Sequence, residues 1–189
     1  MSLQAEIAAC TVCAASLPHG VRPVVSFSST ARLLIIGQAP GSKVHASGVP
    51  WDDQSGDRLR EWTGLTKGQM YDPSQVALVP MGFCYPGKAS GGDKPPRPEC
   101  APKWHNRILG MLPGDRLTLL VGAYAQGYYL PETRRESLAD RVARYRDFLP
   151  SVIPLPHPAW RSTLFMKKHA WFERDLLPEL RTRIAHVMR

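Results

Sequence analysis

The residues of this chain best suited to chemistry include four cysteines. Cys10 and Cys13 form a C-x-x-C pair, while Cys84 and Cys100 are isolated from each other in the sequence. Four thiolates can hold a structural zinc ion or an iron–sulfur cluster. A redox pair is a second interpretation, but Cys10 and Cys13 precede the first predicted strand and so lack the βαβ setting of such a motif. The third interpretation is four buried cysteines that act as small apolar side chains.

A glycine-rich turn, GQAPG, occupies residues 37–41 directly after the apolar run 33–36. Its spacing matches neither of the common phosphate-binding loops. Gly37 and Gly41 have no Cβ, so backbone N–H groups can approach a ligand closely there. The turn contains no acid, base or nucleophile, and it can therefore contribute mainly a backbone rim to a binding site.

Charged and aromatic residues follow in WDDQSGD, residues 51–57, and in PHPAW, residues 156–160. Asp53 can position water or stabilise a cation, but Asp52 and Asp53 equally suit a solvated turn with an N-cap for a helix that begins near Ser55. His157 can donate a hydrogen bond to a developing anion. A histidine that only caps a helix or occupies a turn is the alternative.

The elements that must position these residues alternate along the chain. Short apolar runs at 32–36, 76–79, 117–121 and 152–155 are typical of parallel strands covered on both faces. Amphipathic stretches at 57–63, 101–112, 137–148 and 165–187 predict helices. The pattern indicates an α/β protein, a three-layer α/β/α sandwich around a central four-stranded, mainly parallel sheet, in one domain over residues 1–189. Ligands of such sheets bind beyond the carboxyl ends of the strands, so GQAPG and PHPAW are expected on one face.

Charge suggests a class of partner. The chain has 24 Lys and Arg against 16 Asp and Glu, a net charge of +8 and a pI near 9.6. This balance favours a polyanion such as nucleic acid, although a generic basic protein would show it too. The N-terminus lacks a signal-peptide pattern, and no apolar run approaches the roughly 20 residues that span a bilayer. We expect a cytoplasmic monomer without membrane contact, in which cysteines serve metal binding or burial better than disulfides.

The ordered set of motifs resembles the iron–sulfur (family 4-type) uracil-DNA glycosylases over about residues 10–180. GQAPG is similar to the first active-site motif of that superfamily, and 48–51 to its G-x-P-F segment. Residues 97–100 resemble its R-x-P…C approach to a fourth cysteine, and 157–159 its H-P-S motif. The resemblance implies a 4Fe–4S cluster on Cys10, Cys13, Cys84 and Cys100, with zinc as the fallback metal.

The resemblance also implies a function, the hydrolysis of the N-glycosidic bond of uracil in DNA to leave an abasic site, without a lyase step. It places the extruded base on Trp51, although Trp51 could instead pack in the core. His157 would donate a hydrogen bond to the departing base. The residues implied to line the base pocket are Gly37, Ala39, Pro40, Gly41, Trp51, Met81 and Gly82. Those implied to contact DNA are Arg97, Arg161, Leu164 and Lys167, the loop after His157 supplying a wedge.

Three departures from the family pattern bear on mechanism. Gln38 stands where family 4 members have Glu, and Ala39 where some other members have Asp. An amide cannot act as a general base, although Gln38 can still orient water or the base edge. The catalytic carboxylate is therefore expected at Asp53, which resembles in placement an aspartate of the broad-specificity (family 5-type) members. Pro80 replaces the Asn that reads uracil, so backbone groups near Met81 and Gly82 must read the base, or the pocket accepts other deaminated bases.

Two other functions remain open at this point. Gln38, Ala39 and Pro80 would also suit a catalytically weak or inactive module that binds damaged DNA. A covalent trap for the abasic site is disfavoured, because residues 42–46 lack the basic insertion that such relatives carry after the first motif.

Overall fold

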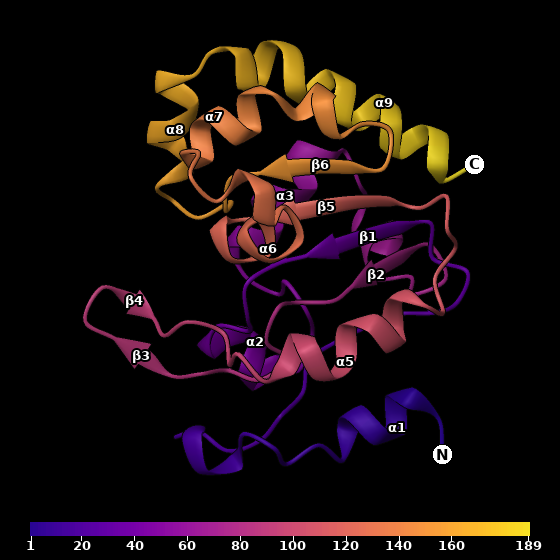
Figure 1. Cartoon of the computed structure of the whole chain (residues 1–189), viewed down its shortest axis with the longest axis vertical. Coiled ribbons are helices and arrows are strands. Elements are labelled where there is room, and N and C mark those ends of the chain that lie inside the picture. Colours follow the sequence, from indigo (N-terminus) through magenta and orange to yellow (C-terminus); the bar gives the residue numbers. More distant parts are fainter.

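The computed structural model describes residues 1–189, and four parallel strands form its centre. They are β1 (Leu33–Ile36), β2 (Val76–Leu78), β5 (Leu117–Val121) and β6 (Val152–Leu155). The sheet order is β2-β1-β5-β6 (Figure 1), with every neighbouring pair parallel. The four strands predicted from apolar runs are thus confirmed within one residue at either end.

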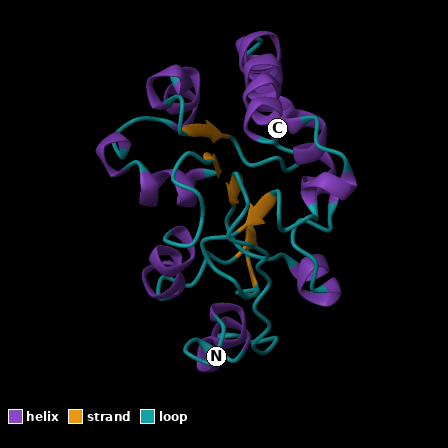
Figure 2. Ribbon diagram, turned by 90° about the vertical axis from the view of Figure 1, so that its right-hand side faces the viewer, coloured by secondary structure: helices purple, strands orange, loops and turns teal.

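Helices cover both faces of this sheet, so the predicted three layers are confirmed (Figure 2). Alternate strand residues point to opposite faces. On one face, Leu33 and Ile35 pack with Leu59 and Trp62 of α3 (Gln54–Thr63) and with the apolar side of α9 (Leu177–Val187). On the other face, a second core joins Leu34 and Ile36 to α5 (Cys100–Leu109), α6 (Ala123–Tyr129) and the N-terminal α1 (Leu3–Ala8).

The predicted helices differ from the observed ones at their ends. The stretch 101–112 ends early, at Leu109, and 137–148 divides into α7 (Leu138–Ala143) and the 3₁₀ turn η3 (Tyr145–Phe148). The stretch 165–187 divides into α8 (Ser162–Lys168), the π-helical turn η4 (Phe172–Leu176) and α9. Pro178 lies in the first turn of α9, where its missing N–H is tolerated, and this position favours a new helical segment there.

Several short elements have no counterpart among the predicted ones. The helices are α2 (Ser42–Ser47) and α4 (Lys67–Met70), and the 3₁₀ turns are η1 (Ala14–Ser16) and η2 (Pro131–Thr133). A hairpin of β3 (Lys88–Ala89) and β4 (Gly92–Asp93) extends from the sandwich beside α2 (Figure 1), within the Gly/Pro/Lys segment 85–98. None of the helices combines the length and the apolar character that crossing a bilayer requires.

Candidate active site

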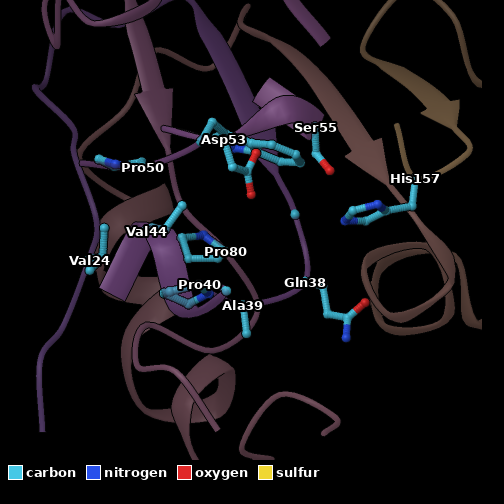
Figure 3. A pocket seen from close by; sticks show the side chains of 13 residues that line it. Val24, Gln38, Ala39, Pro40, Val44, Pro50, Asp53, Ser55, Pro80 and His157 are labelled. Carbon is cyan, nitrogen blue, oxygen red and sulfur yellow. The ribbon is translucent and has the colours of Figure 1, made fainter. Parts of the chain in front are cut away.

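A cavity of about 440 Å³ lies beyond the carboxyl ends of β1, β2 and β6. The segments that follow these strands meet there, as expected for an α/β sheet. Asp53 and His157 point into it from different elements (Figure 3), and Pro40 and Ala39 lie across from Asp53. The thirteen residues that line it are Val24, Gly37, Gln38, Ala39, Pro40, Gly41, Val44, Pro50, Trp51, Asp53, Ser55, Pro80 and His157.

The GQAPG turn is fixed by the segment after β2. The N–H of Met81 donates to the carbonyl of Gly37 at 2.9 Å, and the N–H of Gly82 donates to that of Gln38 at 3.0 Å. Both N–H groups are therefore engaged and cannot read a base edge. Neither Met81 nor Gly82 lines the cavity, so the structure does not bring these two residues into the cavity wall.

Trp51 occupies a constrained position in the cavity wall. Its φ of 58° makes it the one non-glycine residue with a left-handed backbone, a conformation that costs free energy in a bulky residue. A Cβ on Gly37 would lie 2.6 Å from Cζ2 of the ring, and one on Gly56 only 1.7 Å from the Trp51 carbonyl oxygen. The Tyr71 hydroxyl donates to that oxygen at 3.2 Å. Gly37 and Gly56 thus leave the space that Trp51 needs, and the hydrogen bond from Tyr71 fixes its backbone.

Trp51 also contributes to the core, since its partly buried ring packs against the cluster on the α3 side of the sheet. The two interpretations of Trp51 therefore coexist. The ring lines the cavity and packs below it, and this arrangement suits a rigid surface on which a planar base can stack.

Asp53 combines two positions. It is the N-cap of α3, and its Oδ1 accepts a hydrogen bond from the N–H of Gly56 at 2.9 Å. It also lines the cavity, where its carboxylate points inward (Figure 3). One oxygen thus fixes the side chain, while no hydrogen bond to protein engages the other. The helix cap that competed with the catalytic interpretation serves here to orient the carboxylate.

His157 follows β6 and faces Trp51, with 6.0 Å between the two ring centroids. Burial lowers the pKa of His157, and the negative charges of Asp53 and Asp93 oppose this only in part. The imidazole is therefore neutral at neutral pH and can donate one hydrogen bond. Neither ring nitrogen has a hydrogen-bond partner within the protein, so a ligand can take that bond.

Gln38 and Pro80 complete the polar and apolar walls. Gln38 lines the cavity, but its amide is directed away from Asp53 (Figure 3). Pro80 presents an apolar ring, and its carbonyl accepts a hydrogen bond from Nε2 of the buried His105 at 2.9 Å. Nδ1 of His105 pairs with the Tyr129 hydroxyl at 2.5 Å, which leaves the Nε2 proton for Pro80. The side chain of Pro80 thus offers a base no polar group, and one lone pair of its carbonyl oxygen is already engaged.

Sequence reasoning missed several lining residues. Val24 and Val44 are apolar and carried no recognisable signal, whereas Pro50 belongs to the segment 48–51 but was not assigned to the cavity. Ser55 is the polar one, in the first turn of α3 two positions after Asp53, and its hydroxyl has no partner in the protein. Ser55 could have been predicted from the sequence. If Asp53 caps the helix and faces the cavity, residues of the first turn lie beside the cavity as well.

All four cysteines meet in a second cavity of about 340 Å³ between the N-terminal segment, the loop after β2 and the start of α5. Its other walls are mainly apolar and include Phe83 and Trp104. The N–H of Phe83 donates to Sγ of Cys100 at 3.3 Å, a bond that stabilises a thiolate. The sequence-distant cysteines are thus brought together as expected, each of them partly buried.

The cysteine cavity differs from a preformed single-ion site. No three His, Cys, Asp or Glu side chains converge closely enough to hold one metal ion. Burial raises the pKa of the Cys84 thiol and raises that of Cys100 to about 12. Metal binding would therefore have to displace protons from these thiols.

The expected DNA contacts fall in two places. Arg97 lines the cysteine cavity and pairs with Glu99, so the structure places it beside the thiols rather than near the base cavity. Arg161, Leu164 and Lys167 lie together at the start and along α8, and all three are exposed. Next to them Trp160, which belongs to the loop expected to supply a wedge, is 71% exposed, and the Arg161 guanidinium lies 5.2 Å from its ring.

The comparison with known families agrees with this geometry. Residues 25–181 match the family described as the Uracil DNA glycosylase superfamily. The match covers the sheet and every residue of the base cavity except Val24, whereas Cys10 and Cys13 precede it.

Proposed function

Because the chain belongs to the Uracil DNA glycosylase superfamily, we propose that it hydrolyses the N-glycosidic bond of uracil in DNA and leaves an abasic site. The observation that carries this proposal is the convergence of Trp51, Asp53 and His157 on one cavity at the carboxyl edge of the sheet. A glycosylase must extrude a base, hold its face and edge, and stabilise charge on both sides of the breaking bond. These three side chains supply one group for each task.

In the proposed reaction, the extruded base stacks on Trp51, with the backbone of GQAPG along its rim. The C1′–N bond breaks, and the electron pair leaves with the base, which is stabilised as an anion by a hydrogen bond from neutral His157. Asp53 stabilises the positive charge that develops on the sugar and accepts a proton from the water whose oxygen bonds to C1′. Gln38 orients water or the base without taking a proton.

We further infer that the chain resembles the iron–sulfur members and that Cys10, Cys13, Cys84 and Cys100 hold a 4Fe–4S cluster. Zinc would bind four sulfurs at about 2.3 Å from a single centre. A 4Fe–4S cluster instead binds each thiolate at a different iron, which suits four cysteines spread around a cavity with mainly apolar walls. Its role in this chain is structural, because it would join the N-terminal segment to α5 and to the loop after β2.

A damage-binding module without catalysis is the second candidate. It is favoured by the same cavity, in which Gln38 and Ala39 offer no carboxylate and Pro80 offers no side-chain donor. The Asp53 carboxylate separates the two candidates, because recognition of a base does not require a negative charge beside the sugar.

The deciding experiment treats uracil-containing single- and double-stranded oligonucleotides with purified protein and then with alkali, which cleaves abasic sites. We expect strand cleavage by the wild type, and loss of it in the separate variants Asp53→Asn and His157→Ala. Uracil-dependent binding without cleavage would establish the damage-binding module instead. Hypoxanthine and xanthine substrates in parallel test whether the pocket, without an Asn at position 80, accepts other deaminated bases.

A further inference from the structure

Arg58, in the middle of α3, makes three contacts to a distant segment of the chain. Its Nη1 lies 2.7 Å from Ser162 Oγ, 3.0 Å from Thr163 Oγ1 and 3.2 Å from the carbonyl oxygen of Ala159. All three acceptors belong to the segment that follows His157, about a hundred residues further along the chain. One guanidinium nitrogen thus binds α3 to the segment 157–163, which we call the Trp160 loop.

The contacts are built into the fold. Ser162 is buried, and its hydroxyl also donates to the Ala159 carbonyl at 2.7 Å, so Arg58 joins an internal turn rather than a mobile tip. Arg58 lies one turn after Ser55, and side chains at this spacing share one helix face. We call the cavity lined by Trp51, Asp53 and His157 the base cavity. The same face of α3 therefore contributes Ser55 to the base cavity and Arg58 to the loop.

The Trp160 loop and the residue that follows it in α8 present an apolar surface to solvent. Trp160 is 71% exposed and Leu164 is 65% exposed. Between the loop and α3 lies an open hollow, lined by Ser55, Arg58 and Trp160 among others, and Ser55 also lines the base cavity. A base that leaves a DNA stack for the cavity would pass beside this loop.

We propose that Arg58 is a positioning residue, which fixes the Trp160 loop so that Trp160 enters a DNA duplex as the target base leaves it. This inference rests on the proposed glycosylase function and on the wedge that the family resemblance implies for the loop after His157. What it adds is the part of Arg58 in holding that loop. Arg58 acts through Ala159, Ser162 and Thr163 and does not itself contact the base. Its effect is therefore greatest when the base must be extruded from paired DNA.

A contact between Arg58 and a DNA phosphate is the competing explanation, since the other guanidinium nitrogens have no partner in the protein. The two explanations differ in salt dependence. Loss of one phosphate contact lowers the slope of log affinity against log salt by about 0.9. If Arg58 acts only by holding the loop, a role we call the clamp, its loss leaves that slope unchanged. Removal of the Ser162 and Thr163 hydroxyls should then cause the same loss of activity as removal of the Arg58 guanidinium.

The experiment compares the full-length variants R58M, R58K and S162A/T163V on uracil in duplex and in single-stranded DNA. R58M keeps the apolar stem and removes the donors. We expect kcat/KM on the duplex to fall about tenfold or more in R58M, as for loss of a hydrogen bond to a charged group, and the single-stranded rate to stay within about twofold. S162A/T163V should likewise lose more activity on the duplex than on single-stranded DNA. R58K should show a smaller loss of kcat/KM on the duplex than R58M.

R181M is the matched control. Arg181 also braces α3, through the carbonyls of Trp62 and Glu61 at 3.1 and 2.9 Å, but at the C-terminal end of the helix and without a hydrogen bond to the loop. It should reduce stability without a preference between duplex and single strand. Equal losses on both substrates in R58M, or a lower salt slope without an effect of S162A/T163V, would overturn the proposal.

Amide hydrogen exchange makes the clamp measurable without activity. The N–H groups of Ser162 and Thr163 donate to Ala159 and Trp160 within the loop, at 2.9 and 3.2 Å. R58M should speed exchange in the peptide that covers them, and R181M should not. If the wild type proves inactive while R58M frees the loop, the proposed function fails and the clamp stands. Unchanged exchange in R58M would refute the clamp itself.

Discussion

At the scale of single residues, Asp53 allows charge and helix capping to be tested separately. Asn caps a helix about as well as Asp, whereas Ala loses about 1 kcal/mol. We expect D53N to keep the wild-type unfolding free energy while kcat falls about 10²- to 10⁴-fold, the range for a lost general base. D53A should lose both activity and about 1 kcal/mol of stability. Denaturant unfolding with single-turnover kinetics measures both, and a wild-type rate in D53N would show that the carboxylate only caps α3.

His157 gives a prediction with a definite sign in pH. An ordinary histidine has a pKa of about 6.5, and burial lowers the pKa of His157 below this value. The ring of His157 therefore stays neutral at a lower pH than an ordinary histidine does. Activity should be level above about pH 6.5 and should fall only in more acidic solution, as the ring gains a proton. The unfolded chain takes up this proton first, so stability due to the neutral buried ring is lost as pH falls below about 6.5.

D53N changes this titration in a direction that the structure fixes. The Asp53 charge raises the pKa of His157 against the effect of burial, so its removal should lower that pKa further. NMR titration of the imidazole C–H resonances in wild type and D53N measures the shift, with H157A to assign the signal. An upward shift in D53N would contradict the placement of the carboxylate beside the ring.

At the scale of elements, the turn after β1 is matched to one side chain. In G37A the new methyl group would lie 2.6 Å from the Trp51 ring, and the ring would have to move. We expect a loss of about 1–3 kcal/mol in stability from overpacking. Loss of the stacking surface should lower kcat/KM by about 10- to 100-fold, the equivalent of 1–3 kcal/mol.

The matched control for G37A is G127A, in α6. A Cβ at Gly127 meets no atom within 4 Å, and Ala favours a helix over Gly by about 0.5–1 kcal/mol. G127A should therefore keep full activity with equal or higher stability. Full activity in G37A as well would show that the position of the Trp51 ring is unimportant for the base.

The elements also show how far the sequence allows prediction. The strands were predictable because each is a continuous apolar run, buried on both faces. The GQAPG turn and His157 were expected on one face because each follows a strand, whereas Asp53 was assigned to the site through the family resemblance. The engagement of the N–H groups of Met81 and Gly82 could not be predicted from the sequence. Their N–H groups bind the carbonyls of Gly37 and Gln38, and pairing between loops leaves no pattern in side-chain types.

At the scale of the whole molecule, a five-residue segment joins the two cavities. Pro80 lines the base cavity, and Met81 and Gly82 bind the GQAPG turn. Phe83 donates to the sulfur of Cys100, and Cys84 faces the other three cysteines. We therefore expect the shape of the base cavity to depend on what the cysteine cavity holds, because the backbone contacts of these five residues link the two cavities.

The N-terminal segment supplies two of the four cysteines. Its other anchors include the buried Ile7, Leu17 and Val24, an ion pair between Glu6 and Arg107, a hydrogen bond from Arg22 to the Ala46 carbonyl, and a backbone bond from Val24 to Phe83. Figure 1 shows α1 below α5, at the margin of the sandwich. A cluster bound to Cys10 and Cys13 would fasten this segment to the rest of the molecule, since a metal site stabilises the folded state that forms it.

We therefore predict that cluster loss affects both cavities. Purified protein should contain iron and sulfide and absorb visible light, and C84S should lose both metal and colour. In C84S, amide exchange should increase in residues 1–24 and at Met81 and Gly82, and uracil excision should weaken although every side chain of the base cavity is intact. Stoichiometric zinc would replace the cluster by a four-cysteine zinc site and leave the coupling to be tested with C84S. Unchanged exchange at Met81 and Gly82 in metal-free C84S would show that the two cavities are independent.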